Sequence, residues 1–107
     1  KIWNVPSLYV TENGCAALDK RQKESGEILD TDRVMYLRGH LASVRRAIQD
    51  GVPVNGYFLW SLLDNFEWAQ GYTQRFGLHY TNYETQERTP KLSAQFYREV
   101  IRRGDLA

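Results

Sequence analysis

The sequence predicts an α/β fold in which two parallel strands are each followed by a helix. Short apolar or β-branched segments occur at residues 7–11 and 54–60, and each precedes a stretch with apolar residues every three to four positions. Alternation of strand and helix is typical of a parallel sheet covered by helices. Parallel sheets normally have several strands and are covered on both faces. The pattern therefore predicts a piece of a larger α/β structure.

The first predicted strand, residues 7–11, lies between Pro6 and the turn-forming pair Asn13-Gly14. Residues 13–30 are polar and include two glycines, so we expect a long loop there. No repeat or low-complexity segment divides the chain, and we interpret it as one continuous structural piece.

A helix is predicted to begin near Asp32. The side-chain oxygen of Asp30 or Thr31 can cap it by accepting a free backbone N–H. Gly51 suits the left-handed position after the helix, and Pro53 prevents its continuation. The apolar stripe of this helix consists of Val34, Leu37, Leu41, Val44 and Ile48. The charged residues mostly off the stripe are Arg33, Arg38, Arg45, Arg46 and Asp50.

The second predicted strand, residues 54–60, precedes a long aromatic loop at residues 61–88. The last helix is expected to start at Thr89-Pro90, because proline is favoured in the first helical turn, and to end at Gly104. Its apolar positions are Leu92, Phe96, Val100 and Ile101.

Charge and cysteine content exclude several classes of function. Fourteen basic and thirteen acidic residues leave a net charge of +1, which gives no electrostatic reason to expect nucleic acid or an anionic membrane as a partner. No apolar run approaches the roughly 18 residues of a membrane span. Cys15, the only cysteine, excludes an internal disulfide, fits a reducing compartment, and is interpreted as structural or incidental. The chain opens at Lys1 without an initiator Met, so we expect a cut or processed end there.

A carboxylate stands at the end of the first predicted strand, in the sequence Thr11-Glu12-Asn13-Gly14. In β/α architectures this end of the strands carries catalytic groups. By strict alternation, Glu12 shares a face with Val10 and Leu8, the face that would line a barrel interior. Taken alone, the tetrapeptide slightly favours the alternative, a solvated Glu before an Asn-Gly turn.

Aromatic and acidic residues stand at the end of the second predicted strand and shortly after it, namely Trp60, Glu67 and Trp68. Indole faces can cover the apolar faces of a pyranose, while a carboxylate accepts hydrogen bonds from neighbouring hydroxyls. Phe76 could close the same pocket, and ordinary core packing is the alternative for Phe66 and Phe76. The pattern favours a sugar as ligand.

The chain closely resembles the C-terminal part of glycoside hydrolase family 1, the β-glucosidases. The resemblance covers nearly all 107 residues, and it is carried by Tyr9-Val10-Thr11-Glu12-Asn13-Gly14, Asp50-Gly51-Val52, residues 56–68, Gly71-Tyr72, Arg75-Phe76-Gly77-Leu78 and residues 88–94. It implies a (β/α)8 TIM barrel, of which residues 1–107 supply the C-terminal two β/α units as part of a single domain.

The resemblance also implies roles for single residues. Glu12 becomes the nucleophile of a retaining β-glycosidase, and the pocket for the non-reducing sugar contains Trp60, Glu67, Trp68 and Phe76. Glu67 would hold the hydroxyls at C4 and C6, and Trp68 would donate its indole N–H to the hydroxyl at C3. Because Glu67 would repel a phosphate, unphosphorylated glucosides or related sugars are favoured. No metal or organic cofactor is implied.

One half of the catalytic pair is absent from the sequence. The family's acid/base lies in an Asn-Glu-Pro motif on an earlier strand, and no such tripeptide occurs here. A complete barrel needs about 250 residues. The expected partners are therefore a β-glucoside or oligosaccharide and the upstream remainder of the same barrel, and the isolated chain should be inactive.

Two other classes of protein stay open as alternatives. A sugar-binding module would explain the Trp-rich loop but leaves Glu12 without a role. A non-catalytic fragment would act only by completing a barrel with another chain.

Overall fold

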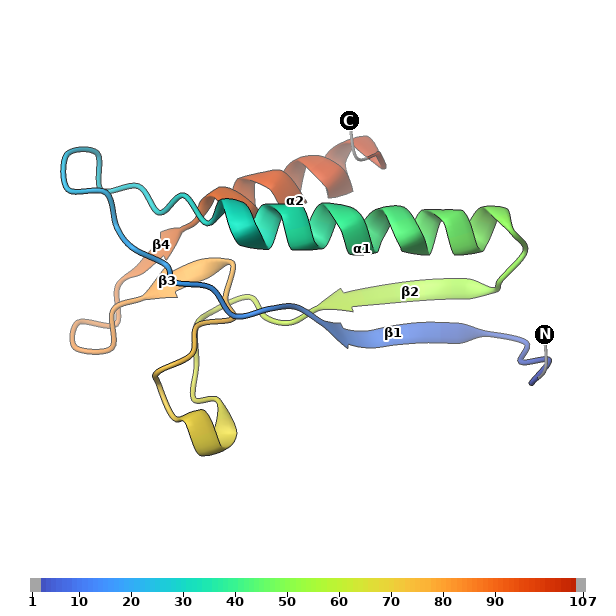
Figure 1. Ribbon diagram of the computed structural model, residues 1–107, viewed down its shortest axis with the longest axis horizontal. Helices are drawn as coiled ribbons and strands as arrows, with labels where there is room; N and C mark the ends of the chain where they lie inside the picture. The colour runs from blue at the N-terminus through green and yellow to red at the C-terminus, as the bar shows by residue number, and fades with distance from the viewer. Residues whose placement is uncertain (1–2, 106–107) are drawn as a thin grey trace.

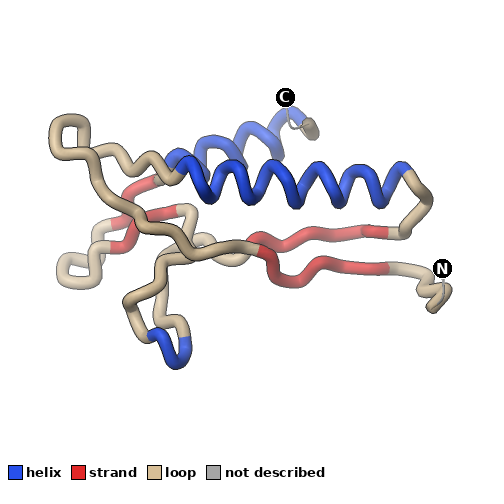
Figure 2. The backbone as a smooth tube through the Cα atoms, viewed as in Figure 1, coloured by secondary structure: helices blue, strands red, loops and turns tan. Residues whose placement is uncertain are grey.

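The computed structural model describes residues 3–105 of the chain. Its elements, in chain order, are β1 (Leu8–Asn13), α1 (Thr31–Gln49), β2 (Val54–Leu59), the short 3-10 helix η1 (Trp68–Gln70), β3 (His79–Thr81), β4 (Arg88–Pro90) and α2 (Leu92–Arg103). Helices α1 and α2 lie together on one side of the β1–β2 pair, and the loops gather beyond the carboxyl ends of both strands (Figure 1). The loop with η1 extends away from the helices (Figure 2).

Strands β1 and β2 are parallel neighbours joined through α1, which confirms the predicted pairing. Their register is irregular near the carboxyl end, because Val10 lies opposite Tyr57 whereas Asn13 lies opposite Leu59. Three steps along β1 therefore match two along β2. Strict alternation, which the sequence analysis assumed for Glu12, is interrupted at this point. Irregularities of this kind bend a strand and change the direction of its side chains.

Asp30, one of the two residues predicted to cap α1, occupies the N-cap position, but the predicted capping hydrogen bond from its side chain is absent. Its carboxylate instead accepts hydrogen bonds from the Arg33 guanidinium and from the backbone N–H and hydroxyl of Ser93. The carboxylate is thus used to join the first turns of α1 and α2.

Arg33 lies off the apolar stripe of α1, as expected, yet it is only 1% exposed. A buried guanidinium is tolerated when it is paired and hydrogen-bonded. Here Asp19 accepts two of its N–H groups, at 2.9 and 3.0 Å, and Asp30 accepts another. On the stripe itself, Leu37 is fully buried while Ile48 is half exposed.

Few apolar side chains form a core. Among residues 3–105, the buried apolar ones are Ile28, Leu37 and Leu78, whereas the charged side chains of Arg33 and Lys91 are buried beside them. Large apolar side chains on the strands stay exposed, including Phe58 on β2 at 59%. The described part of the chain therefore leaves much apolar surface uncovered.

The predicted loop at residues 61–88 and the start of the last helix need correction. β3 and β4 pair as an antiparallel hairpin in which His79 lies opposite Pro90. Pro90 is thus in a strand rather than in the first helical turn, and α2 begins at Leu92. The backbone N–H of Lys91 donates to the Leu78 carbonyl, and the backbone at Lys91, the residue before α2, is still extended.

Both predicted helix ends at glycine are confirmed. Gly51 has φ +89° and Gly104 has φ +67°, the left-handed conformation that glycine adopts at little cost. No helix within residues 3–105 combines the length and the apolar character needed to cross a bilayer.

Candidate active site

The structure brings all five predicted site residues to one pocket. It lies beyond the carboxyl ends of β1 and β2 and has a volume of about 410 Å³. The predicted residues that line it are Glu12, Trp60, Glu67, Trp68 and Phe76. Asn13, Gly14 and Tyr36 line it as well, although they were not among the residues predicted from the sequence to form the site.

Glu12 stands in the irregular end of β1 and is exposed to the pocket. Within residues 3–105 its carboxylate has no hydrogen-bond or ion-pair partner. An unpartnered carboxylate keeps its oxygen lone pairs available to a ligand. Of the two readings left open for this residue, a carboxylate lining a shared pocket fits the geometry better than one that merely precedes a turn.

The junction of the two strands sets Glu12 beside Trp60. The Trp60 N–H donates to the Asn13 carbonyl at 2.9 Å. A Cβ on Gly14 would lie 1.7 Å from the Trp60 carbonyl oxygen, a distance no side chain can occupy. Glycine at this position therefore allows the β1 end to approach β2 closely enough to form one wall of the pocket.

The opposite wall comes from the loop around η1. Glu67 precedes η1 and is fixed by its backbone, since its N–H donates to the Gly71 carbonyl at 2.7 Å. Trp68 is 84% exposed, so its indole is available to a ligand. Phe66, for which core packing was an alternative, is 60% exposed and contacts Tyr72 edge-on instead of lining the pocket.

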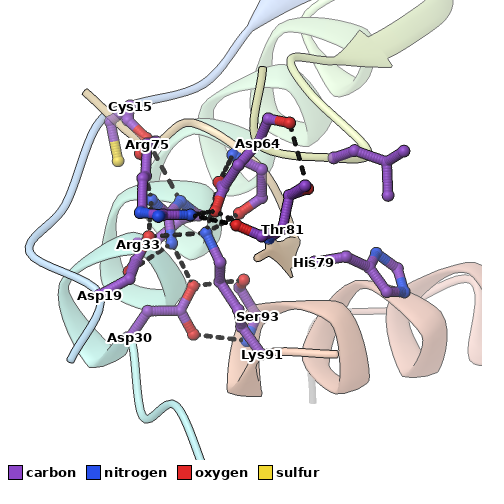
Figure 3. Close-up of polar contacts among 12 residues, drawn as sticks. Cys15, Asp19, Asp30, Arg33, Asp64, Arg75, His79, Thr81, Lys91 and Ser93 are labelled. Carbon is purple, nitrogen blue, oxygen red and sulfur yellow. Dashed lines mark hydrogen bonds and ion pairs between the residues drawn. The ribbon is translucent and has the colours of Figure 1, made fainter. Parts of the chain in front are cut away.

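Asp64, which precedes this loop in the chain, belongs to a buried ionic cluster (Figure 3). The Asp64 carboxylate accepts hydrogen bonds from the Gly77 N–H at 2.9 Å, from Arg75 at 2.6 Å and from Lys91 at 2.8 Å. Burial alone would raise the pKa of Asp64, but the hydrogen bonds from Lys91 and Arg75 outweigh it and hold that pKa below its usual value. Asp64 therefore stays ionised and anchors the backbone next to Phe76.

Lys91 connects this cluster to the first loop. Its ammonium, fully buried, donates to Asp19 at 2.6 Å, to Asp64 and to the Gly77 carbonyl at 2.7 Å. The partners lie up to 72 residues apart in the chain, so no local pattern could have predicted the cluster. Cys15 lies at its edge, outside the pocket, and burial raises the pKa of its thiol (Figure 3).

The pocket is lined by the unpartnered carboxylate of Glu12, by a second carboxylate, Glu67, and by aromatic rings. Such a lining can stack on a sugar ring, accept hydrogen bonds from its hydroxyls and present one oxygen nucleophile. Across residues 3–105, no group of three or more His, Cys, Asp or Glu side chains is arranged to hold a metal ion.

A family model described as glycosyl hydrolase family 1 matches residues 1–106. The chain belongs to glycosyl hydrolase family 1. It is 53% identical over 104 residues to the 1,4-beta-D-glucan glucohydrolase of Thermotoga neapolitana, an alignment that covers 97% of this chain and 23% of that protein. The match to beta-glucosidase A of Thermotoga maritima is 49% identical and covers the same shares.

Solved structures of family 1 enzymes are also similar to this chain. The family 1 b-glucosidase from Thermotoga maritima, in complex with isofagomine lactam, superposes with a TM-score of 0.95 and 48% identity. The superposition covers 98% of this chain and 24% of that one. The chain thus spans less than a quarter of the length of these family 1 relatives.

Proposed function

We propose that this chain is the C-terminal part of a β-glucosidase that hydrolyses β-glycosides with retention of configuration. The observation that carries the proposal is the single pocket in which an unpartnered Glu12 faces Trp60, Glu67, Trp68 and Phe76. Membership of family 1 and relatives named as β-glucosidases support it.

The segment itself would be the last two β/α units of a (β/α)8 barrel. Residues 1–107 form part of one barrel domain in this proposal; residues 1–2 and 106–107 lie outside the described part. The support is the parallel β1–β2 pair with its helices on one side, and the apolar surface left open beside it. A groove of about 430 Å³ lined by Tyr57, Leu59 and Ile101 is part of that surface. The upstream remainder of the barrel is the partner that would cover it.

In the proposed reaction, the ionised Glu12 attacks the anomeric carbon as the glycosidic C–O bond breaks. An acid from an upstream strand protonates the departing oxygen. That same group then takes a proton from water, and the water attacks the anomeric carbon and releases the sugar from Glu12. Two inversions give net retention, and the two carboxyl groups of such pairs lie about 5–5.5 Å apart. The mechanism needs no metal or organic cofactor.

Substrate selection is assigned to the aromatic loop. Glu67 accepts hydrogen bonds from the C4 and C6 hydroxyls, and the Trp68 indole N–H donates to the C3 hydroxyl. Trp60 and Phe76 provide apolar faces for the ring. A phosphate group would meet the negative charge of Glu67, so the proposed substrates are unphosphorylated β-glucosides or oligosaccharides. The net charge of +1 supports neither nucleic acid nor a membrane as a partner.

The test replaces Glu12 in the full-length enzyme, meaning the polypeptide in which the barrel around this segment is complete. Glu12→Gln keeps the size but removes the charge, so turnover should fall by several orders of magnitude while substrate binding persists. With Glu12→Ala, azide should enter the vacated space and give the α-glycosyl azide.

Other results would overturn the proposal. A β-configured azide product, or near-normal hydrolysis by either variant, would remove Glu12 from the mechanism. Sugar binding without hydrolysis by the unmodified full-length protein would favour the sugar-binding module. Activity only after a second chain is added would favour the barrel-completing fragment.

A further inference from the structure

Asn13, the residue after Glu12, is held from two elements at once. The Tyr57 hydroxyl, from β2, donates to Asn13 Oδ1 at 2.7 Å. Asn13 Nδ2 in turn donates to the Tyr36 hydroxyl, from α1, at 3.1 Å. The backbone of Asn13 is also fixed, because its carbonyl accepts the Trp60 N–H at 2.9 Å. We call the three side chains Tyr57, Asn13 and Tyr36 the Asn13 clamp.

The clamp lies where the strand itself gives Glu12 little support. Between Val10 and Asn13 the register of β1 shifts against β2, so the ladder does not fix the direction of the residues between them. The Glu12 carboxylate has no partner in the described part of the chain. Asn13 is therefore the nearest point on the C-terminal side at which the backbone of Glu12 is tied to the rest of the fold.

Both tyrosines of the clamp are themselves restrained. Tyr57 is half-buried, and burial, with smaller contributions from Tyr97 and Tyr36, raises the pKa of Tyr57 to about 12, so its hydroxyl keeps its proton and donates. The Tyr36 ring stacks on His40 with centroids 3.9 Å apart and planes inclined by 26°. Restraint on both sides limits the movement of the amide between them.

We propose that Asn13, clamped between Tyr57 and Tyr36, is a positioning residue that aims the Glu12 carboxylate at the anomeric carbon. The inference rests on the proposed function, in which Glu12 is the nucleophile. Nucleophilic attack requires reacting atoms about 3–3.5 Å apart and aligned, and a displacement of about 1 Å can cost roughly 100-fold in rate. The sugar contacts in the proposed function are Trp60, Glu67, Trp68 and Phe76, so loss of the clamp should slow the attack much more than it weakens sugar binding.

The experiment compares Asn13→Ala, Tyr57→Phe and Tyr36→Phe in the full-length enzyme. Rapid mixing with an aryl β-glucoside measures the rate constant of glycosylation and, from its dependence on substrate concentration, the Kd of the substrate; the melting temperature is measured alongside. We expect Asn13→Ala to lower the glycosylation rate constant by about 10- to 100-fold and each tyrosine variant by about 3- to 10-fold, with Kd within about twofold. The control is Tyr9→Phe, which removes the hydroxyl of an exposed tyrosine on the same strand as Asn13, outside the pocket, and it should leave the rate unchanged.

A double variant separates the clamp from a general effect on stability. If the clamp acts as a unit, Tyr57→Phe added to Asn13→Ala should slow glycosylation by less than about twofold more. Normal glycosylation in Asn13→Ala would overturn the inference, as would a rate loss in Tyr9→Phe equal to that in Tyr57→Phe. Should Asn13→Ala fail to fold, Tyr57→Phe decides, because it removes a single oxygen atom.

Covalent labelling of Glu12 distinguishes a failure of the clamp proposal from a failure of the proposed function. A slow fluorinated glucoside that leaves a covalent sugar on Glu12 shows that Glu12 is the nucleophile in each variant. Unchanged rates together with labelled Glu12 overturn the clamp alone. Absence of the label from Glu12 in the unmodified enzyme overturns the proposed function itself.

Discussion

At the scale of single residues, the pocket depends on close approaches that only glycine permits. A Cβ on Gly14 would collide with the Trp60 carbonyl, and one on Gly77 would lie 2.2 Å from the Asp64 backbone nitrogen. Both glycines stand beside pocket residues, Gly14 near Glu12 and Gly77 next to Phe76. Their small size therefore sets the distance between the two strand ends and the loop around η1 that lines the pocket.

Gly14→Ala should separate the β1 end from β2. We expect it to lower the free energy of unfolding of the full-length enzyme by at least the 1–3 kcal/mol typical of overpacking, and to reduce kcat. The matched control is Gly39→Ala on α1, where an added Cβ would meet nothing within 4 Å. Alanine is the better helix former, so this variant should gain about 0.5–1 kcal/mol. Denaturant unfolding measures both, and equal effects at the two positions would contradict the account.

Glu67 should determine which sugar is preferred. Removing one charge-assisted hydrogen bond costs about 1.5–3 kcal/mol, so Glu67→Ala should lower kcat/KM by roughly 10- to 100-fold. The variant should also lose discrimination between C4 epimers, measured with aryl glucosides and galactosides. Glu84→Ala, at an exposed position between β3 and β4, is the control and should behave like the parent. Unchanged epimer discrimination in Glu67→Ala would show that the C4 hydroxyl is bound elsewhere.

At the scale of elements, the buried ionic cluster joins parts of the chain that do not form a common core. Lys91, at the start of α2, links Asp19 in the first loop with Asp64 in the loop of the pocket. Arg33 ties the start of α1 to the same first loop. Because each charge has its partners in the cluster, the pocket loop is held by ion pairs rather than by apolar packing.

Lys91→Met should show how strongly this cluster holds the elements. The substitution leaves Asp19 and Asp64 buried without their common cation, and breaking a buried pair in this way costs about 3–5 kcal/mol. Arg102→Met is the control, since its ion pair with Glu99 is exposed and such pairs contribute about 0–1 kcal/mol. Thermal unfolding of the full-length enzyme measures both. Comparable losses in the two variants would mean that the cluster adds no more than a surface pair.

The sequence predicts those elements that depend on neighbouring residues, and it fails for those that depend on contacts between separate parts of the chain. Strands β1 and β2 and helix α1 follow from local patterns, and the ends of both helices follow from Gly51 and Gly104. The pairing of β3 with β4 placed Pro90 in a strand, and this hairpin contact overrode its local preference for a helix start. Contacts across the chain also decide the burial of Lys91, whose carboxylate partners Asp19 and Asp64 lie 72 and 27 residues away, and of Arg33, which pairs with Asp19 as well as with the neighbouring Asp30. The pocket residues could be identified from their motifs, but Asn13, Gly14 and Tyr36 required the spatial arrangement.

At the scale of the whole molecule, the described segment has more apolar surface than it can bury. Its dimensions of 49 × 33 × 18 Å describe a flat body, and its buried apolar residues within positions 3–105 are few. Surfaces of this kind normally face another part of a protein. This matches the proposal that the remainder of a barrel covers the open side of β2 and α2.

The isolated 107-residue chain should therefore be marginally stable and catalytically inactive. Exposed apolar groups should drive aggregation or association, visible as concentration-dependent size in light scattering. No hydrolysis of an aryl β-glucoside is expected, because the chain lacks the proposed proton donor. A cooperative melt of a monomer, or measurable turnover, would contradict the proposal that the fold and the site are completed by upstream residues.

The most direct test of the central claim is to locate the covalent intermediate in the full-length enzyme. A 2-fluoro glucoside with a good leaving group should accumulate the glycosyl-enzyme, which trypsin digestion and mass spectrometry then map. Cleavage after Lys1 and Lys20 yields the peptide 2–20, whose only carboxylate side chains are Glu12 and Asp19. Asp19 is buried in ion pairs, so fragmentation should place the sugar on Glu12. A sugar found on any other residue, or no covalent sugar during active turnover, would contradict the assignment of Glu12 as the nucleophile.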